Sequence, residues 1–207
     1  MSDVTADSVV NLCGAIGLGV AMLALHRRDP RGPLTKRLLF ALGVAAALFL
    51  MRGVAWWTET EWLDRLSLIP AALVPLGALV VTEGILRRHA PRSVKMAAML
   101  GAIVLGPVGA LGPQHFATLY SVALSLFQLA GFATCAWLLV ARDRTTLLAS
   151  ENRSIGRVAL GAVLVTPFIV TDFVALVPDI PVRLGRVYTL TASLVGRGAG
   201  SSSHRSP

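Results

Sequence analysis

Residues Leu66–Leu86 read LSLIPAALVPLGALVVTEGIL, and the basic segment RRHAPRSVK follows at residues 87–95. Glu83 is the one charged side chain in the first stretch. An apolar run of about 20 residues is long enough to cross a ~30 Å hydrocarbon core as a helix. An apolar run that ends in a short basic loop is typical of a transmembrane helix ending at the cytoplasmic face.

The same pattern recurs along the chain, which is 55% hydrophobic and 14% charged, whereas soluble domains are about 25% charged. We predict six spans, at Val9–Leu25, Leu38–Trp57, Leu66–Leu86, Met96–Leu111, Phe116–Ala141 and Val158–Val177. The runs are continuously apolar rather than alternating, which favours helices over a barrel. We therefore predict an all-α fold, a polytopic transmembrane helix bundle over residues 1–195 with a flexible tail at 196–207.

Charge alternates between the loops on the two sides of this predicted bundle. Thirteen of the 19 basic residues lie after spans one, three and five: Arg27, Arg28, Arg31, Lys36, Arg37, Arg87, Arg88, Arg92, Lys95, Arg142, Arg144, Arg153 and Arg157. The loop Thr58–Arg65, after span two, is acidic instead. By the positive-inside rule the basic loops are cytoplasmic and the N-terminus is outside. The net charge of +8 is thereby explained, and no nucleic-acid partner is expected.

Tryptophans gather at both predicted boundaries, with Trp56, Trp57 and Trp62 at the outer one and Trp137 near the inner one. Aromatic belts of this kind mark membrane–water interfaces. The large excess of Arg over Lys, with abundant Ala and Gly, indicates a GC-rich bacterial gene. We therefore expect a multi-pass protein whose first partner is the lipid bilayer of the bacterial cytoplasmic (inner) membrane.

The end of the chain is interpreted in two ways. Pro178–Pro181 predicts a tight turn outside. Residues Leu184–Val195 are apolar again but too few to cross. They form either a partial seventh span, with a cytoplasmic C-terminus, or an interfacial helix that leaves the C-terminus outside. We favour the partial span, and the change in composition at Gly196 indicates a truncated or altered end.

Two ionisable residues lie inside the predicted spans at matching depth. Arg52 and Asp172 each lie 15 residues outward of a basic edge, which is about 22 Å at ~1.5 Å per residue. An ionisable residue inside a span costs several kcal/mol unless it is paired, so it is a candidate functional residue. We expect an ion pair between them, or contacts to a ligand entering from outside. Alternatively Arg52 extends to Glu59 or Glu61, and Asp172 faces a wet vestibule.

The fifth span carries a polar face, because Ser121, Ser125 and Gln128 follow one another at i, i+4 and i+7. We expect this face to point into the bundle and to make interhelical hydrogen bonds, with a polar ligand pocket as the alternative. In the third span, Glu83 stands four residues before Arg87, a spacing that predicts a local ion pair.

No catalytic, metal or cofactor motif is found, so we expect neither an enzyme nor a bound cofactor. Cys13 and Cys135 belong to no metal-ligand or C-x-x-C pattern and are expected to be buried small side chains. No lysine lies within a span, which excludes a retinal Schiff base. The four histidines, His26, His89, His115 and His204, lie in loops or the tail, so a transmembrane bis-histidine haem site is not available.

Two short segments resemble parts of the membrane modules of bacterial sensors. They are Glu83–Pro91, after the third span, and the turn Pro178–Pro181, which Arg183 follows. An N-out bundle of six or seven short-looped spans resembles the modules that precede histidine kinase, diguanylate cyclase or DNA-binding output domains. The resemblance implies a signalling module that responds to a small ligand or to membrane state, with a cytoplasmic partner or a missing output domain. The alternatives are a small transporter or channel subunit and an assembly protein without ligand.

Overall fold

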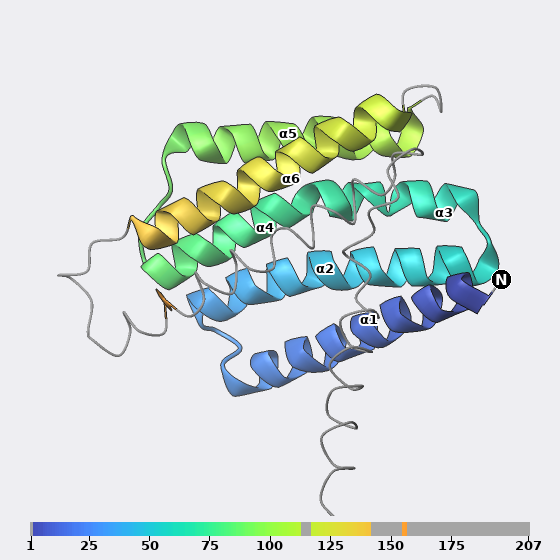
Figure 1. Ribbon diagram of the computed structural model, residues 1–207. Helices are drawn as coiled ribbons and strands as arrows, with labels where there is room; N and C mark the ends of the chain where they lie inside the picture. Colours follow the sequence, from blue (N-terminus) through green and yellow to red (C-terminus); the bar gives the residue numbers. More distant parts are fainter. Residues whose placement is uncertain (1, 113–116, 142–154, 157–207) are drawn as a thin grey trace, which may run out of the picture.

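The computed structural model describes residues 2–112, 117–141 and 155–156, and in these ranges it is all-helical (Figure 1). The helices are α1 (Ser2–Arg28), α2 (Pro33–Thr58), α3 (Glu61–Leu66), α4 (Leu68–Leu86), α5 (Arg92–Leu111) and α6 (Ala117–Val140). Five stretches are long and apolar enough to span a membrane: Asp7–Arg28, Pro33–Thr58, Glu61–Leu86, Arg92–Leu111 and Thr118–Val140. The first five predicted spans are therefore confirmed as helices. The sixth span, the partial seventh and the tail lie outside the described residues.

Local sequence sets where α2 and α4 begin and end. Helix α2 begins at Pro33, whose missing N–H costs nothing in a first turn, and the Gly32 N–H just before it donates to Asp29 Oδ1 at 2.9 Å. Helices α2 and α4 are followed directly by Glu59 and Arg87, which have φ values of 52° and 51°. This left-handed conformation is the usual way to end a helix, although glycine is the commoner residue there.

The segment Thr58–Arg65, expected to be a loop, contains a helical turn instead. Helix α3 continues almost directly into α4 through Ser67, whose hydroxyl donates to the Asp64 carbonyl at 2.6 Å. Acidic residues in its first turn complement the helix dipole, and Arg65 pairs with Glu61 at 2.8 Å. These local terms favour helix over an irregular loop.

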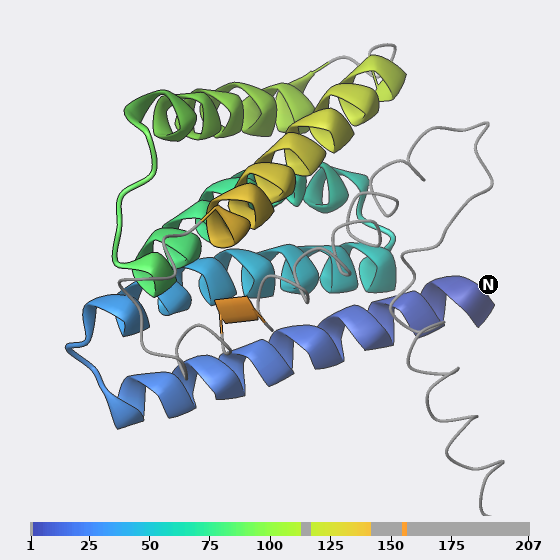
Figure 2. The ribbon, with the colours of Figure 1, turned by 60° about the vertical axis from the view of Figure 1, so that its left-hand side comes forward.

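Helix α4 is the centre of the bundle. It contacts α2 on one side and both α5 and α6 on the other, while α1 packs chiefly on α2. Figure 2 shows α1 and α2 side by side, with α4 beyond them and α6 crossing over it. Helix α1 is consequently the least buried span and α4 the most buried.

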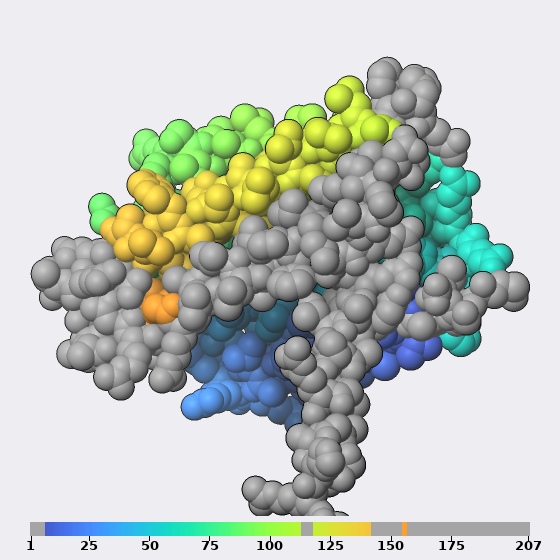
Figure 3. All heavy atoms as spheres, viewed as in Figure 1, coloured from blue at the N-terminus to red at the C-terminus, as the bar shows by residue number. Residues whose placement is uncertain are grey.

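Glycines allow the helices to approach closely, and three contacts show this. A Cβ at Gly53 of α2 would meet Leu12 of α1, and one at Gly101 of α5 would collide with the Phe127 ring of α6. A Cβ at Gly131 of α6 would lie 2.5 Å from the Pro75 Cβ of α4. Small residues at helix contacts are typical of membrane bundles, and the space-filling view shows α5 and α6 in direct contact (Figure 3).

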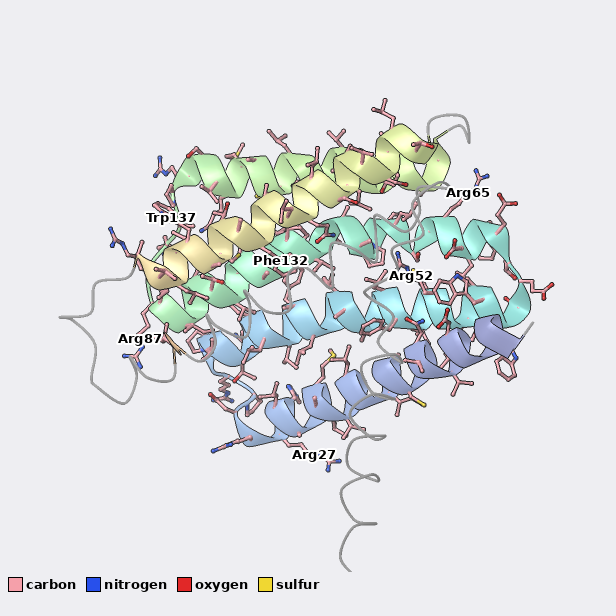
Figure 4. All side chains as sticks on the ribbon, viewed as in Figure 1. Arg27, Arg52, Arg65, Arg87, Phe132 and Trp137 are labelled. Carbon is pink, nitrogen blue, oxygen red and sulfur yellow. The ribbon has the colours of Figure 1, made fainter. Side chains whose placement is uncertain are left out.

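The two ends of the bundle differ in charge, as the loop pattern predicts. Because consecutive spans are antiparallel, the turns after α1 and α4 meet at one end, where Arg87 is labelled in Figure 4, and Arg65 lies at the other. Trp57 and Trp62 are exposed at the Arg65 end and Trp137 is exposed toward the Arg87 end. This arrangement agrees with aromatic belts at two boundaries.

Candidate functional site

The interior of the described bundle holds polar side chains beside its apolar clusters, and large apolar side chains also lie on its outside. The buried polar residues are Ser8, Thr35, Arg52, Ser67, Thr82, Glu83, Ser121, Ser125 and Gln128. Outside, Ile16, Ile103 and Leu119 are each more than 60% exposed. So many exposed large apolar side chains are unusual for a water-soluble domain and suit helices surrounded by lipid.

The polar face of α6 points into the bundle as expected, with Ser121, Ser125 and Gln128 at most 5% exposed. Ser125 donates within its own helix, to the Ser121 carbonyl at 2.8 Å. Gln128 reaches a second helix, donating from Nε2 to the Ala71 carbonyl of α4 at 2.5 Å. The prediction of interhelical hydrogen bonding is thus confirmed for Gln128.

Arg52 of α2 is only 7% exposed, so its side chain is enclosed by protein. Leu48, one turn before Arg52, belongs to the apolar cluster that also contains Tyr120, and the Arg52 charge acts electrostatically on the Tyr120 hydroxyl. The expected partner, Asp172, lies outside the described residues, so the ion pair stays a prediction. Figure 4 shows Arg52 in the half of the bundle toward Arg65.

Two buried polar atoms, Tyr120 Oη and Gln128 Oε1, have no hydrogen-bond partner among the described residues. The Tyr120 hydroxyl lies against Gly109 of α5, where a Cβ would collide with it, and close to Leu68 of α4. The two residues lie on one face of α6, and their backbone positions are about 12 Å apart along the helix axis at ~1.5 Å per residue, with Leu124 buried between them.

The sequence interpretation did not single out Tyr120. The available signal was its position eight residues before Gln128, which places both on the same helical face. A tyrosine near the start of a span reads instead as an interfacial aromatic residue. Its location beside Arg52 depends on how α2 and α6 pack against α4, which spacing along one helix does not reveal.

At the basic end, Glu83 links α4 to the turn that follows it. Its Oε1 accepts the Ala90 N–H at 2.7 Å and pairs with Lys95 Nζ of α5 at 2.8 Å. His89 Nδ1 lies 3.8 Å from Oε2. Only Arg87 was predicted as a partner, so sequence reasoning missed the contact to Lys95.

The two cysteines differ in exposure. Cys135 of α6 is buried as expected, whereas Cys13 of α1 is exposed, because α1 packs chiefly against α2. Within the described ranges, no group of three or more His, Cys, Asp or Glu residues is arranged to hold a metal ion.

Comparison with protein-family models, curated proteins and solved structures gives no match for this chain. The five long apolar helices and the polar interior are compatible with a membrane protein of several spans.

Proposed function

We propose that this chain is a sensory membrane module that binds a small polar ligand between its helices. It would lie in the bacterial cytoplasmic membrane with its N-terminus outside. The ligand would enter the outer half, the half toward Arg65, and the response would pass to a cytoplasmic signalling partner or output domain.

The observation that carries the proposal is the buried Tyr120 hydroxyl, which has no partner among the described residues. Burying an unpaired hydroxyl costs roughly 1–3 kcal/mol. A phenylalanine would fill the same space without that cost. Polar groups kept inside a membrane bundle at a cost are by default candidates for function.

The chemistry around Tyr120 limits what the ligand would be. Near Tyr120, Arg52 supplies hydrogen-bond donors and a positive charge, and the Tyr120 hydroxyl donates or accepts. Gln128 Oε1 lies two helical turns further along α6, beyond Leu124, and is out of reach of the same small ligand. A ligand that satisfies Arg52 and Tyr120 needs an acceptor group. Asp172, in the predicted sixth span, would complete the site.

Transport through the same polar residues is the second candidate, and the packing beyond Gln128 argues against it. Toward the basic end, the buried α6 residues of the described bundle are Cys135 and Leu139, which pack with Leu79, Ile85 and their neighbours. The buried polar side chains of α4 in this half are already engaged, since Thr82 bonds the Ala78 carbonyl and Glu83 bonds Ala90 and Lys95. A transport path would need polar groups on both sides of Gln128.

The experiment uses Tyr120→Phe, which removes one oxygen and keeps the ring. Without ligand we expect the variant to be at least as stable as the wild type, with a gain of up to ~3 kcal/mol, since it no longer buries an unpaired hydroxyl. We expect benzyl alcohol, benzamide or benzoate, three probes of similar size, to raise the thermal midpoint of the wild type in nanodiscs and to have a weaker effect on the variant.

Ser125→Ala is the matched control, because its hydroxyl bonds within α6. Loss of stability in Tyr120→Phe alone would show that the hydroxyl has a structural partner and would contradict the proposal. Equal probe responses in all chains, or none, would contradict it too. Benzoate uptake into proteoliposomes that disappears in Arg52→Gln would favour the transporter.

A further inference from the structure

A surface notch lies where α3 meets the C-terminal end of α5. It has a volume of about 490 Å³ and is lined by Glu61, Trp62, Arg65, Leu66, Ala110 and Leu111. We call it the α3–α5 notch. It shares no residue with the polar cluster around Tyr120, so it stands independently of the proposed function.

The lining divides into a polar rim and an apolar wall. On the rim, Arg65 and Glu61 pair at 2.8 Å, and both remain partly accessible. Trp62 is exposed beside them, and Leu111, at the end of α5, is 83% exposed. An accessible charge pair next to an indole and an open apolar wall suits a molecule with a polar head and an apolar body.

The notch lies at the level where a headgroup would be found. Trp57 and Trp62 are both exposed at this end of the bundle, each at the end of a candidate span. Tryptophan is enriched at the depth of lipid headgroups. The apolar wall therefore faces the acyl-chain region and the rim faces the headgroup region.

The charge at this end selects among headgroups. The described residues here include the acidic side chains Glu59, Glu61 and Asp64 against the single cation Arg65. Like-charge repulsion disfavours an anionic lipid or free phosphate. A zwitterionic headgroup instead presents an ammonium to Glu61 and the Trp62 face, which attracts cations through its quadrupole, and a phosphate to Arg65.

We infer that the α3–α5 notch binds the headgroup of a zwitterionic phospholipid, with the ammonium at Glu61 and Trp62, the phosphate at Arg65 and an acyl chain along Leu111. The Glu61–Arg65 pair is complementary to the two charges of such a headgroup. The occupied notch would anchor α3 and the end of α5 at the membrane surface.

Native mass spectrometry of the full chain tests this inference. The protein is released from micelles containing equal amounts of dioleoyl phosphatidylcholine, phosphatidylethanolamine and phosphatidylglycerol. We expect the zwitterionic lipids to be retained about three- to fivefold over phosphatidylglycerol, the ratio that one exposed cation–π contact supplies. We expect Trp62→Leu to lose most of this preference. We expect Arg65→Gln to lower the retention of all three lipids and to keep the preference, because it removes the cation that every phosphate would contact while the acidic surroundings remain.

Trp57→Leu is the matched control, because Trp57 is equally exposed at the same end but does not line the notch. It should keep the wild-type preference. Equal retention of the three lipids would overturn the inference, as would an equal loss in Trp57→Leu. Competition by soluble glycerophosphocholine at equal concentration would show that the headgroup alone is bound, and would overturn the assignment to a lipid.

Discussion

Gln128 of α6 hydrogen-bonds the backbone carbonyl of Ala71 in α4, at 2.5 Å from Nε2 to the oxygen. In an unbroken helix this carbonyl would accept the N–H of residue 75. Residue 75 is a proline inside α4 and has no N–H. In a membrane, a carbonyl freed by proline is satisfied by a neighbouring helix or by ordered water. Gln128 therefore supplies the hydrogen bond that Pro75 removes from the central helix α4, and the same bond links α6 to α4.

Removing this bond should destabilise the bundle. We expect Gln128→Leu to lower the free energy of unfolding by about 1–2 kcal/mol, because the Ala71 carbonyl would be left without a donor. Unfolding in mixed micelles, followed by circular dichroism, measures the loss. Thr134→Val is the control, since Thr134 bonds only the Ala130 carbonyl of its own helix and is exposed; it should cost at most about 0.5 kcal/mol.

A second substitution isolates the role of Pro75. In Pro75→Ala the helix regains an N–H for the Ala71 carbonyl, so Gln128→Leu should cost less in that background than in the wild type. Such non-additivity is the signature of two residues serving one partner. Equal costs in both backgrounds would mean that Gln128 stabilises the bundle in some other way.

The close packing of α6 on α4 at Pro75 also limits the size of the side chain at residue 131. A Cβ at Gly131 would lie 2.5 Å from the Pro75 Cβ, and a proline ring cannot turn aside. We expect Gly131→Ala to cost about 1–3 kcal/mol, the usual penalty for overpacking, in the same unfolding assay. Gly17→Ala on α1 has nothing within 4 Å and should be neutral or slightly stabilising, because alanine favours helix. Equal effects at both positions would contradict the close approach of α6 to α4.

Features set by composition and spacing along one segment could be predicted from the sequence. Apolar length identified five helices, loop charge identified the basic end, and the spacing of Ser121, Ser125 and Gln128 identified a buried face. Each depends on residues within one element or its flanking loops. That is why these predictions hold without knowledge of how the helices pack.

Features that join separate elements could not be predicted. The partner of Gln128 is a backbone atom in α4, and the one clue to it is Pro75, four residues further on. Lys95 reaches Glu83 across a turn, twelve residues away in the chain. Tyr120 lies within electrostatic range of Arg52 only because α2 and α6 both pack on α4. The helical turn α3 was missed because its apolar content is low and its stabilising contacts are local charges.

Glu83 should control how firmly the turn between α4 and α5 is held. Its carboxylate bonds both the Ala90 N–H and Lys95, and charge-assisted bonds contribute ~1.5–3 kcal/mol each. We expect Glu83→Ala to speed tryptic cleavage after Arg87 and Arg88 by about tenfold or more. Glu83→Gln, which keeps an acceptor for Ala90, should give an intermediate rate.

Glu61→Ala is the control for this assay, because its pair with Arg65 is exposed and such pairs contribute little. It should leave cleavage at Arg87 and Arg88 unchanged. Cleavage as slow in Glu83→Ala as in the wild type would mean that other contacts hold the turn.

The charge difference between the two ends predicts orientation. Each variant carries one introduced cysteine. We expect Thr60→Cys to react with a membrane-impermeant maleimide on intact cells, and Arg31→Cys and His89→Cys to react only after permeabilisation. Cys13→Ser serves as the background, because Cys13 is exposed, and the buried Cys135 is retained. The reverse pattern would place the N-terminus in the cytoplasm and move the Arg52–Tyr120 cluster to the inner half, where a ligand from outside would not reach it. Equal labelling of all three positions on intact cells would contradict a spanning bundle altogether.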